Sequence, residues 1–451
     1  MNSRNDPKAR AIAAARAAAG HRPGRAEPAV GGDGWPEAAN FAQLADYRNI
    51  ERMRMAGSAM GVANPYFRLH DGHATAQTVI DGRETINFAS YDYVGLNADP
   101  RTAAAAKEAI DRYGVSPSGS RLVSGARPVH LGLEAALARH YGAAAAICFV
   151  SGHSTNVSTI GCLMTEGDLI VQDTLVHNSI QVGARLSGAA RRSFAHNSMA
   201  ALEALLIENR ARYRNALIVV EGHYSMDGDT APLAQLVALK RKYGCWLMVD
   251  EAHALGCVGA TGKGVFEHTG VDPTEVDIWM GTLSKTLAST GGYIAGSAAL
   301  IDLLMAHASG YVYSVALAPA LAASALTALE LLEAEPWRVR KLQDNTALFI
   351  RSARAAGLDT GAAEPFSIVP IMVGDSLVAA KLSERLLARG INALPVIFPA
   401  VPMQGARLRF FLTALHDAAL IRAAVEATAE ELQKLRDDQF GTAIPLALLN
   451  L

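Results

Sequence analysis

The sequence lacks several features that would point to particular classes of protein, beginning with an excess of charge. Lysine and arginine number 41 against 43 aspartate and glutamate, so the formal net charge of −2 predicts neither a nucleic-acid partner nor binding to an anionic membrane. No stretch reaches the roughly 18 consecutive apolar residues that a membrane helix needs. The first residues also lack the charged start and apolar segment of a signal peptide. We therefore expect no transmembrane segment and no secretion, and partners that are small molecules or other protein chains.

Cysteine is scarce, and the four that occur show no CxxC spacing. They are Cys148, Cys162, Cys245 and Cys257. The first three lie in or beside apolar runs, where free thiols usually pack as small hydrophobic groups. We expect a reduced, cytoplasmic protein without a metal site.

The length of 451 residues exceeds the roughly 250–300 residues that a single core usually reaches, so more than one domain is expected. Residues 1–38, which include RAIAAARAAAGHRPGRAEPAVGGDG, predict a disordered or partly helical extension. Its Arg and Ala content resembles a transit peptide, but Asp6, Glu27 and the absence of a Ser bias argue against one. We divide the rest into an N-terminal segment (39–100), a large domain (101–333) and a small C-terminal domain (334–451).

From about residue 140, short apolar runs alternate with amphipathic helical stretches. The runs are AAAAICFV, DLIVQD, ALIVVE, CWLMVD, VDIWMG and GYIAGS. Between the third and the fourth, Pro232 suits a first helical turn and Gly244 follows the helix end. Leu233, Leu236 and Val237 share one face of that helix. Strand, helix and strand in this order predict an α/β fold with a mostly parallel central sheet.

Beyond about residue 330 the pattern changes to a long charged helix, ALELLEAEPWRVRKLQDNTALFIRSARAAG, which Pro336 breaks. The segments that follow are SIVPIMVGD, a helix at about 375–389, INALPVIFPAVP and ARLRFFLT. They predict a smaller α+β domain, and we find no internal repeat.

Polar and small residues follow each predicted strand of the large domain. In an open parallel sheet, ligands bind beyond the carboxyl ends of the strands. The residues in question are Ser151, Gly152 and His153 after CFV, Asp173 and then His177, Asn178 and Ser179 after DLIVQ, Gly222 to Gly228 after IVVE, Glu251 and His253 after LMVD, and Thr282, Ser284 and Lys285 after IWMG. The sequence therefore predicts a site at this edge.

Two of these residues suggest a cofactor. Burial at a strand end would lower the pKa of Lys285, and a neutral amine readily forms an imine. Asp250, which ends an apolar strand, stays ionised only with a cationic partner such as a protonated pyridine nitrogen. An imine-forming lysine and a pyridinium-binding aspartate are what pyridoxal 5'-phosphate requires.

The other residues at this edge suit the rest of that cofactor. A phosphate needs donors, and Gly152 and His153 at a predicted helix start, with the Thr282 and Ser284 hydroxyls, can supply them. His177 can lie against the ring as an aromatic plate. The sequence indicates no role for Glu251.

Each element also has a structural interpretation. Asp250 and His253, three positions apart, could be a helix cap and a buried imidazole, and a lysine in a Gly/Ser-rich loop could be a surface residue or a phosphate anchor. The phosphate-loop pattern GxxxxGK[ST] is absent, because Ser284 precedes Lys285. Only the joint order after successive strands favours the cofactor.

From about residue 60 to 440 the chain resembles the α-oxoamine synthases, a fold-type-I pyridoxal phosphate family that includes 8-amino-7-oxononanoate synthase and serine palmitoyltransferase. The resemblance lies in INFASYDYVGL, GVSPSGSRLVSG, EGHYSMDGDTAPL, VDEAHALGCVGATGKG, GTLSKTLASTGGYIAGS and ARLRFFLTALH. SYDYVGL is closer to the SYNYLG of serine palmitoyltransferases than to the SNDYLG of oxononanoate synthases.

The resemblance implies a role for each matching residue. Lys285 would form the imine and act as general base, and Asp250 would pair with the pyridine nitrogen. His253 and Ser225 would bind the phenolic oxygen, and His177 would stack on the ring. Gly152, His153 and Thr282 would contact the phosphate together with the Ser284 hydroxyl, and Arg409 would bind the amino acid carboxylate. Arg407, two residues before Arg409, is expected to point to the other face and to be structural.

The chain departs from the family pattern at three positions. His153 stands where an aromatic Phe or Tyr is usual. Val315 follows Ser314 where a threonine usually reaches the phosphate of the neighbouring subunit's cofactor, so Ser314 is the expected substitute. Asp92 replaces an asparagine in the serine palmitoyltransferase pattern and would put a carboxylate near the substrate's own.

The implied activity is a decarboxylative Claisen condensation of serine, alanine or glycine with an acyl-CoA or acyl-carrier-protein thioester, in a homodimer with shared active sites. Two alternatives stay open. Another fold-type-I enzyme, an aminotransferase or an aldolase-like lyase, would share Asp250 and Lys285. A non-catalytic partner subunit would lack the lysine, which is present here.

Overall fold

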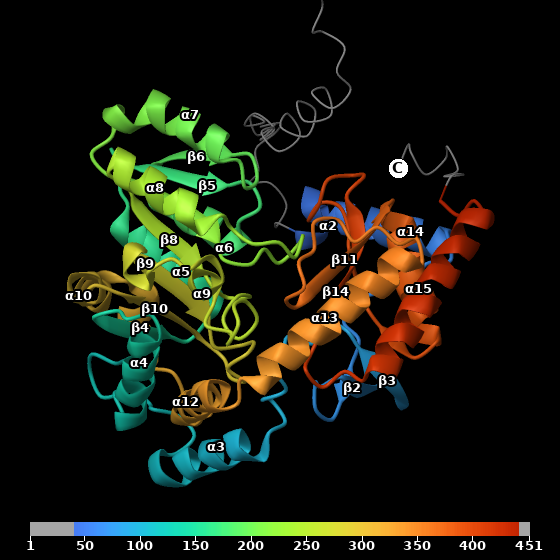
Figure 1. The fold of residues 1–451 in the computed structure, drawn as a ribbon, viewed down its shortest axis with the longest axis horizontal. Coiled ribbons are helices and arrows are strands. Elements are labelled where there is room, and N and C mark those ends of the chain that lie inside the picture. The colour runs from blue at the N-terminus through green and yellow to red at the C-terminus, as the bar shows by residue number, and fades with distance from the viewer. Residues whose placement is uncertain (1–39, 442–451) are drawn as a thin grey trace, which may run out of the picture.

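The computed structural model describes residues 40–441, and the extension predicted for residues 1–38 lies outside them. Figure 1 shows a larger body built on a broad sheet and a smaller body beside it. Helix α13 (Trp337–Ala355) runs diagonally between the two. In this part of the chain no helix is long and apolar enough to cross a membrane.

The larger body is built on a sheet of seven strands within the described residues, in the order β4-β10-β9-β8-β7-β5-β6. Their bounds are β4 (Ala145–Phe149), β5 (Leu169–Asp173), β6 (Ala190–Phe194), β7 (Ala216–Glu221), β8 (Trp246–Asp250), β9 (Ile278–Thr282) and β10 (Gly292–Gly296). Strand β10 pairs antiparallel with β4 and β9, and the other pairs are parallel. The segment 283–291 is too short for a crossover helix, which explains the antiparallel step. The predicted mostly parallel sheet is confirmed.

Successive side chains of the central strands enter two different cores. Along β7, Leu217 and Val219 pack with α5 (Gly152–Leu163), α6 (Asn178–Leu186) and α10 (Ala298–His307). Ile218 packs on the other face with α4 (Pro128–His140), α7 (Met199–Asn209), α8 (Leu233–Tyr243) and α12 (Pro319–Ala334). Helix α3 (Pro100–Tyr113) packs on α12. Because both faces are buried, the strands read as continuous apolar runs in the sequence.

The predicted helix boundaries follow from proline and glycine. Pro232 precedes α8, and Gly244 ends it with φ 60°, a left-handed conformation that glycine adopts without strain. Pro336 separates α12 from α13, as predicted, because a proline interrupts the helical hydrogen bonds.

The smaller body combines the C-terminal region with the N-terminal segment. Strands β11 (Ile368–Gly374), β14 (Ala406–Phe411) and β13 (Leu394–Val396) form one sheet, beside α14 (Ser376–Ala388) and α15 (Ala418–Asp437). The second sheet contains β1 (His70–Asp71), β2 (Gln77–Ile80), β3 (Arg83–Asn87) and β12 (Ile391–Asn392), and α2 (Ala45–Ala59) precedes it in the chain. Since β3 pairs with β12 in parallel, strand pairing joins residues 83–87 to the C-terminal region. The proposed domain boundaries stay a prediction.

Candidate active site

The carboxyl ends of the parallel strands bring the predicted polar residues to one edge of the central sheet. Glu221 ends β7, Asp250 ends β8 and Thr282 ends β9, and the first two lie opposite each other in register. Helix α5 begins at Gly152, shortly after β4, so its N-terminus faces the same edge. Loops after these strands therefore converge where ligands bind in this class of fold.

A cavity of about 400 Å³ lies at this edge. Its lining includes most of the residues predicted from sequence, namely Gly152, His153, His177, Ser225, Asp250, His253, Thr282, Ser284, Lys285 and Arg409. Ser314 and Asp92 are not part of it. The structure thus brings together residues that lie more than 250 positions apart in the chain.

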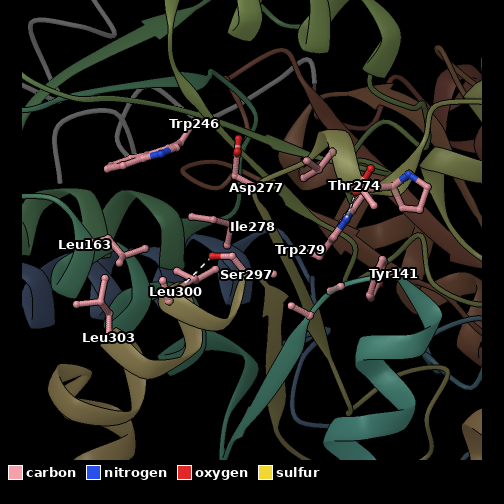
Figure 2. A pocket seen from close by; sticks show the side chains of 17 residues that line it. Tyr141, Leu163, Trp246, Thr274, Asp277, Ile278, Trp279, Ser297, Leu300 and Leu303 are labelled. Atoms are coloured by element: carbon pink, nitrogen blue, oxygen red, sulfur yellow. Dashed lines mark hydrogen bonds between the residues drawn. The ribbon is translucent and has the colours of Figure 1, made fainter.

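A second cavity, of about 440 Å³, lies at the opposite edge of the same sheet (Figure 2). Trp246, which begins β8, and Leu303 of α10 contribute to its largely apolar wall. Asp277 also lines it, but its carboxylate lies 2.6 Å from Lys240 Nζ and accepts a hydrogen bond from the Leu247 N–H at 2.7 Å. Because this acid is already paired, we assign the chemistry to the first cavity.

The start of α5 forms a corner suited to an anion. Ser151 caps the helix, its Oγ accepting from the Ser154 N–H at 3.4 Å. Gly152 lies so close to Thr282 that a Cβ on it would fall 2.7 Å from Thr282 Oγ1, and this oxygen lies 2.7 Å from Ser284 Oγ. A helix N-terminus beside two hydroxyls supplies the donors that a phosphate needs.

The carboxylate of Asp250 is buried and forms no salt bridge with any residue in the range 40–441. Its Oδ2 accepts from Asn156 Nδ2 at 2.8 Å and its Oδ1 from the Ala252 N–H at 2.9 Å. Both donors are neutral, so no cationic side chain of residues 40–441 makes direct contact with this carboxylate. A carboxylate in this setting fits a cationic ligand group such as a protonated ring nitrogen.

Lys285 and Glu221 both have shifted pKa values. Burial lowers the pKa of Lys285 to about 8, against the opposing effect of the Asp250 and Glu221 charges. Burial and the nearby Asp250 raise the pKa of Glu221 to about 8. Glu221 Oε2 accepts from the Ser225 N–H at 3.3 Å, while Oε1 is buried without a partner among the described residues. The cavity therefore holds an amine and an acid that change protonation near neutral pH.

His253 and Ser225 lie on the cavity wall as predicted for residues that bind a ring oxygen. Burial lowers the pKa of His253 well below its ordinary value, so the ring is neutral. Its Nδ1 lies 2.7 Å from the hydroxyl of buried Tyr93, and the phenol can donate to it. When the phenol donates, Nε2 of His253 is the nitrogen that carries a hydrogen.

His177 is the N-cap of α6 and lines the cavity. Its Nδ1 accepts from the Ser179 N–H at 3.3 Å and lies 2.7 Å from Ser179 Oγ. Burial lowers the pKa of His177. The His153 ring is edge-on to it, with 6.2 Å between ring centroids. The neutral imidazole is therefore held by its own helix start, with its plane available to a ligand.

Two arginines of β14 reach the loop that carries Ser225. Arg409 Nη1 donates to the Ser225 carbonyl oxygen at 2.9 Å, and Arg407 Nη1 donates to Asp227 Oδ1 at 2.6 Å. The expectation that Arg407 points to the other face is wrong, because residues i and i+2 of a strand share a face. Its ion pair agrees with the structural role expected for it. Arg409 Nε is buried without a partner within residues 40–441.

Asp92 does not reach the cavity, so the predicted substrate contact is corrected. Its side chain is buried, and Oδ1 accepts from the N–H groups of Leu96 at 2.9 Å and Asn97 at 3.1 Å. An aspartate that binds nearby backbone N–H groups stabilises a turn. The adjacent Tyr91 lines the cavity instead.

Ser314 lies outside the cavity of its own chain, and its Oγ donates to the Val315 carbonyl oxygen at 3.2 Å. The predicted phosphate contact concerns the site of a neighbouring subunit. It stays a prediction.

Glu251, for which the sequence suggested no role, ties two loops together. Its carboxylate is fully buried and accepts from the Val265 N–H, at the start of α9 (Val265–Thr269), at 3.2 Å. A Cβ on Gly222 or Gly264 would collide with this carboxylate. Burial raises the pKa of Glu251 to about 8. The side chain therefore supports the loops beside the cavity rather than lining it.

Sequence reasoning gave no role to Asn156, Ser179 and Glu221, which line the cavity. Glu221 gave a detectable signal, because it ends an apolar strand in the same way as Asp250. Asn156 lies one helical turn beyond Gly152, and in the sequence only the first residues of that predicted helix indicated a ligand contact. Ser179 follows a predicted strand, but its contact with Asn156 depends on the packing of α5 against α6, which a single sequence does not specify.

Comparisons with known proteins agree with this geometry. The model of the aminotransferase class I and II family matches residues 83–427. An 8-amino-7-oxononanoate synthase of Methylorubrum populi is 44% identical over 350 residues, which cover 77% of this chain and 86% of that protein.

Two solved structures are similar over most of the chain. Serine palmitoyltransferase of Sphingomonas wittichii has a TM-score of 0.83 and 31% identity, covering 88% of this chain and 100% of that one. A structure of SPT with a PLP internal aldimine has the same TM-score and coverages at 29% identity.

Proposed function

Since the chain belongs to the aminotransferase class I and II family, in its α-oxoamine synthase branch, we propose that it joins a small L-amino acid to an acyl thioester. It is a pyridoxal phosphate-dependent C-acyltransferase. A carbon–carbon bond forms between the amino acid α-carbon and the acyl carbonyl carbon, the thiol leaves, and the amino acid carboxylate leaves as CO2. The product is an α-amino ketone.

The residues of the cavity fit pyridoxal 5'-phosphate. Asp250 is a buried carboxylate without a cationic partner in the described chain, which suits the protonated ring nitrogen. The α5 start at Gly152, with Thr282 and Ser284, suits the phosphate. The Asp250 charge facing Lys285 across one cavity is the observation that carries the proposal.

When bound, pyridoxal phosphate supplies a protonated ring that withdraws electrons from the substrate α-carbon. Asp250 would keep that ring protonated, and His253 and Ser225 would hold its oxygen. Lys285, whose pKa burial lowers to about 8, takes the α-proton as general base. His177 would lie against the ring, and the buried walls of the cavity would limit access of water to the substrate α-carbon.

Arg409 binds the amino acid carboxylate in this proposal. Its unpartnered Nε and the fork shape of a guanidinium suit two-point contact with a carboxylate. Serine, alanine and glycine are the proposed amino acids. The similar proteins include both an oxononanoate synthase and a serine palmitoyltransferase, so we propose no single acyl chain. The proposed acyl donor is a thioester of CoA or of a carrier protein.

We also propose a homodimer with shared active sites. Tyr313 and Val123 are 88% and 84% exposed in the single chain. The segments that carry them are joined by a hydrogen bond from the Ala316 N–H to the Gly119 carbonyl oxygen. Exposed apolar groups gathered on neighbouring segments mark interaction surfaces. In the dimer, Ser314 would reach the cofactor phosphate of the partner chain.

A cytoplasmic location is proposed because Cys148, Cys245 and Cys257 are buried free thiols and Cys162 is a half-buried one. Free thiols are typical of reducing compartments.

Two other activities are less well supported. An aminotransferase or aldolase-like lyase would use Asp250 and Lys285 in the same places, and only the products separate these enzymes from an α-oxoamine synthase. A non-catalytic subunit is disfavoured because Lys285, Asp250 and His177 all line one cavity.

The first test is spectroscopic. The purified protein with pyridoxal phosphate should show the visible absorption band of lysine-bound cofactor, and glycine, alanine or serine should perturb it. Lys285→Ala should lose the band and the activity, because within residues 40–441 no other lysine lines the cavity. Lys263→Ala, at an exposed position, is the matched control and should keep both. A Lys285→Ala protein with an unchanged band would remove Lys285 from its role.

A further inference from the structure

A chain of hydrogen bonds connects Asp250 to His177 through two residues for which sequence offered no role. Asn156 Nδ2 lies 2.8 Å from Asp250 Oδ2 and 2.9 Å from Ser179 Oγ. Ser179 Oγ lies 2.7 Å from His177 Nδ1. Asn156 and Ser179 are almost completely buried, so water does not compete for these contacts. We propose that Asn156 and Ser179 are positioning residues that hold neutral His177 with its hydrogen on Nε2.

The donor-to-acceptor direction of these hydrogen bonds is set at Asp250. An ionised Asp250 only accepts hydrogen bonds, so the Asn156 amide must turn its NH2 group toward it. That NH2 has two hydrogens, one for Asp250 Oδ2 and one for Ser179 Oγ. The amide oxygen of Asn156 is then left buried and without a partner among the described residues, as observed. Ser179 Oγ therefore accepts from Asn156.

The same direction continues to the imidazole. Since Ser179 Oγ accepts from Asn156, its single hydrogen is free to donate, and within residues 40–441 the acceptor beside it is His177 Nδ1. The Ser179 N–H also points to Nδ1, at 3.3 Å. Two donors from one residue thus meet one nitrogen lone pair, and Nδ1 carries no hydrogen.

The opposite tautomer would disrupt this chain. A hydrogen on Nδ1 would face the Ser179 N–H, donor against donor. It would also require Ser179 Oγ to accept from both His177 and Asn156, which leaves the buried hydroxyl hydrogen without an acceptor in the described part of the chain. Buried donors are rarely left unsatisfied in native proteins.

The consequence for the reaction rests on the proposed function. With Nδ1 occupied as an acceptor, Nε2–H is the donor that the imidazole has left, and it makes no hydrogen bond with the described residues. His177 lines the cavity, so Nε2–H can donate to an oxygen of the bound substrate. Asn156 and Ser179 also link Asp250, which would hold the ring nitrogen, to His177, which would lie against the ring.

The experiment is histidine side-chain NMR on the holoenzyme, labelled with 15N-histidine and free of substrates. The His177 signals are assigned by their loss in His177→Asn. We expect the wild type to show one tautomer, with hydrogen on Nε2 and none on Nδ1. In Ser179→Ala, where only the longer N–H contact remains, a measurable Nδ1–H population should appear. By analogy with the partners of metal-binding histidines, whose loss typically costs roughly 10- to 100-fold in affinity or activity, kcat should fall at least about tenfold with a smaller change in KM.

Ser383→Ala is the matched control, since Ser383 is equally buried but lies in the smaller body, where its Oγ contacts Arg68 and the Ala393 carbonyl oxygen. It should leave the His177 tautomer and kcat unchanged. Asn156→Ala should shift the tautomer in the same direction as Ser179→Ala. A wild-type His177 with its hydrogen on Nδ1, or a Ser179→Ala enzyme with the wild-type tautomer and kcat, would overturn the proposal. Because the spectrum is recorded without substrates, it decides the tautomer whether or not the proposed reaction is correct.

Discussion

Three ionisable residues at adjoining strand ends set the chemistry of the cavity. Asp250 and Glu221 end neighbouring parallel strands, and Lys285 faces them. Two buried acids side by side do not both ionise readily, and the pKa of Glu221 is raised accordingly, by burial and by the Asp250 charge. The arrangement keeps one negative charge for the cofactor ring and an amine that loses its proton near neutral pH.

The lowered pKa of Lys285 predicts how the apoenzyme takes up its cofactor. Only the neutral amine attacks the aldehyde of pyridoxal phosphate. The rate at which the visible band grows after mixing should rise about tenfold per pH unit up to about pH 8 and then level off, because the pKa of Lys285 is about 8. An ordinary lysine, with a pKa near 10.4, would give a rate that keeps rising to about pH 10. Stopped-flow absorbance over a pH series measures this.

Asp250→Asn gives an internal check on that profile. The Asp250 charge opposes the lowering of the Lys285 pKa, so its removal should move the levelling point to lower pH. A levelling point that stays in place or rises would contradict the assigned coupling.

The site residues that sequence could predict are those with a position-specific signal. Lys285, Asp250 and His253 lie at or within a few residues of the ends of apolar runs, and in this class of fold such strand ends meet at the edge of the sheet where ligands bind. The expectation that Arg407 and Arg409 point to opposite faces is wrong, and the sequence already contradicts it, because residues two apart in a strand share a face. Asn156 and Ser179 depend on the packing of α5 against α6, which a single sequence does not specify.

At the scale of elements, the loop between β7 and α8 is held from several sides. His196, after β6, lies with Nδ1 3.0 Å from Asp173 Oδ1 and Nε2 2.8 Å from Asp229 Oδ2. Burial lowers the pKa of His196, but the hydrogen bonds and charges of Asp173 and Asp229 outweigh this and raise it to about 10. Asp229 lies in the loop that carries Ser225, so a charged His196 anchors that loop to β5.

His196→Ala should destabilise the fold. Removing one partner from a buried charged cluster typically costs roughly 3–5 kcal/mol in the free energy of unfolding, and we expect the lower end because His196 is partly exposed. Urea denaturation monitored by circular dichroism measures the change. His307→Ala, at an exposed position at the end of α10, should change the free energy of unfolding by much less.

The pH dependence of this difference has a definite sign. The pKa of His196 is higher in the folded protein, about 10, than in the unfolded chain, near 6.5. Its stabilisation is therefore fully present below about pH 6.5 and is lost as pH rises toward 10. The gap between wild type and His196→Ala should shrink over that range, and a gap that grows with pH would contradict the assignment.

The elements themselves were predictable where both local and global signals agreed. The central strands read as apolar runs because helices cover both faces of the sheet. Pro336 and Gly244 set helix boundaries through backbone chemistry alone. The pairing of β3 with β12 joins positions about 300 residues apart, and a two-residue strand such as β12 has too short a pattern to be recognised.

At the scale of the whole molecule, the cavity is assembled from both bodies. Lys285 and Asp250 come from the larger body, while Arg409 comes from β14 of the smaller one. The Arg407–Asp227 ion pair fixes β14 to the loop that carries Ser225. The strand that carries Arg409, the proposed carboxylate-binding residue, is therefore connected directly to the loop that carries a proposed cofactor-binding residue.

The proposed homodimer can be tested by mass and by mutation. Sedimentation should give twice the chain mass of 47.6 kDa. Tyr313→Asp and Val123→Asp place charges on residues that are exposed in the single chain, so they should shift the equilibrium toward monomer and lower activity by removing the shared sites. Phe398→Asp, on an exposed apolar residue of the smaller body, is the control. A fully active monomeric wild type would refute shared sites.

The proposed reaction couples carbon–carbon bond formation to loss of the amino acid carboxylate. The most direct measurement is release of labelled CO2 from carboxyl-labelled glycine, alanine or serine by the pyridoxal phosphate-loaded enzyme, with and without an acyl thioester. We predict that CO2 and free thiol form in equal amounts, that both require the amino acid and the thioester together, and that mass spectrometry finds the matching α-amino ketone. A keto acid formed without CO2 would instead show an aminotransferase and contradict the proposed reaction.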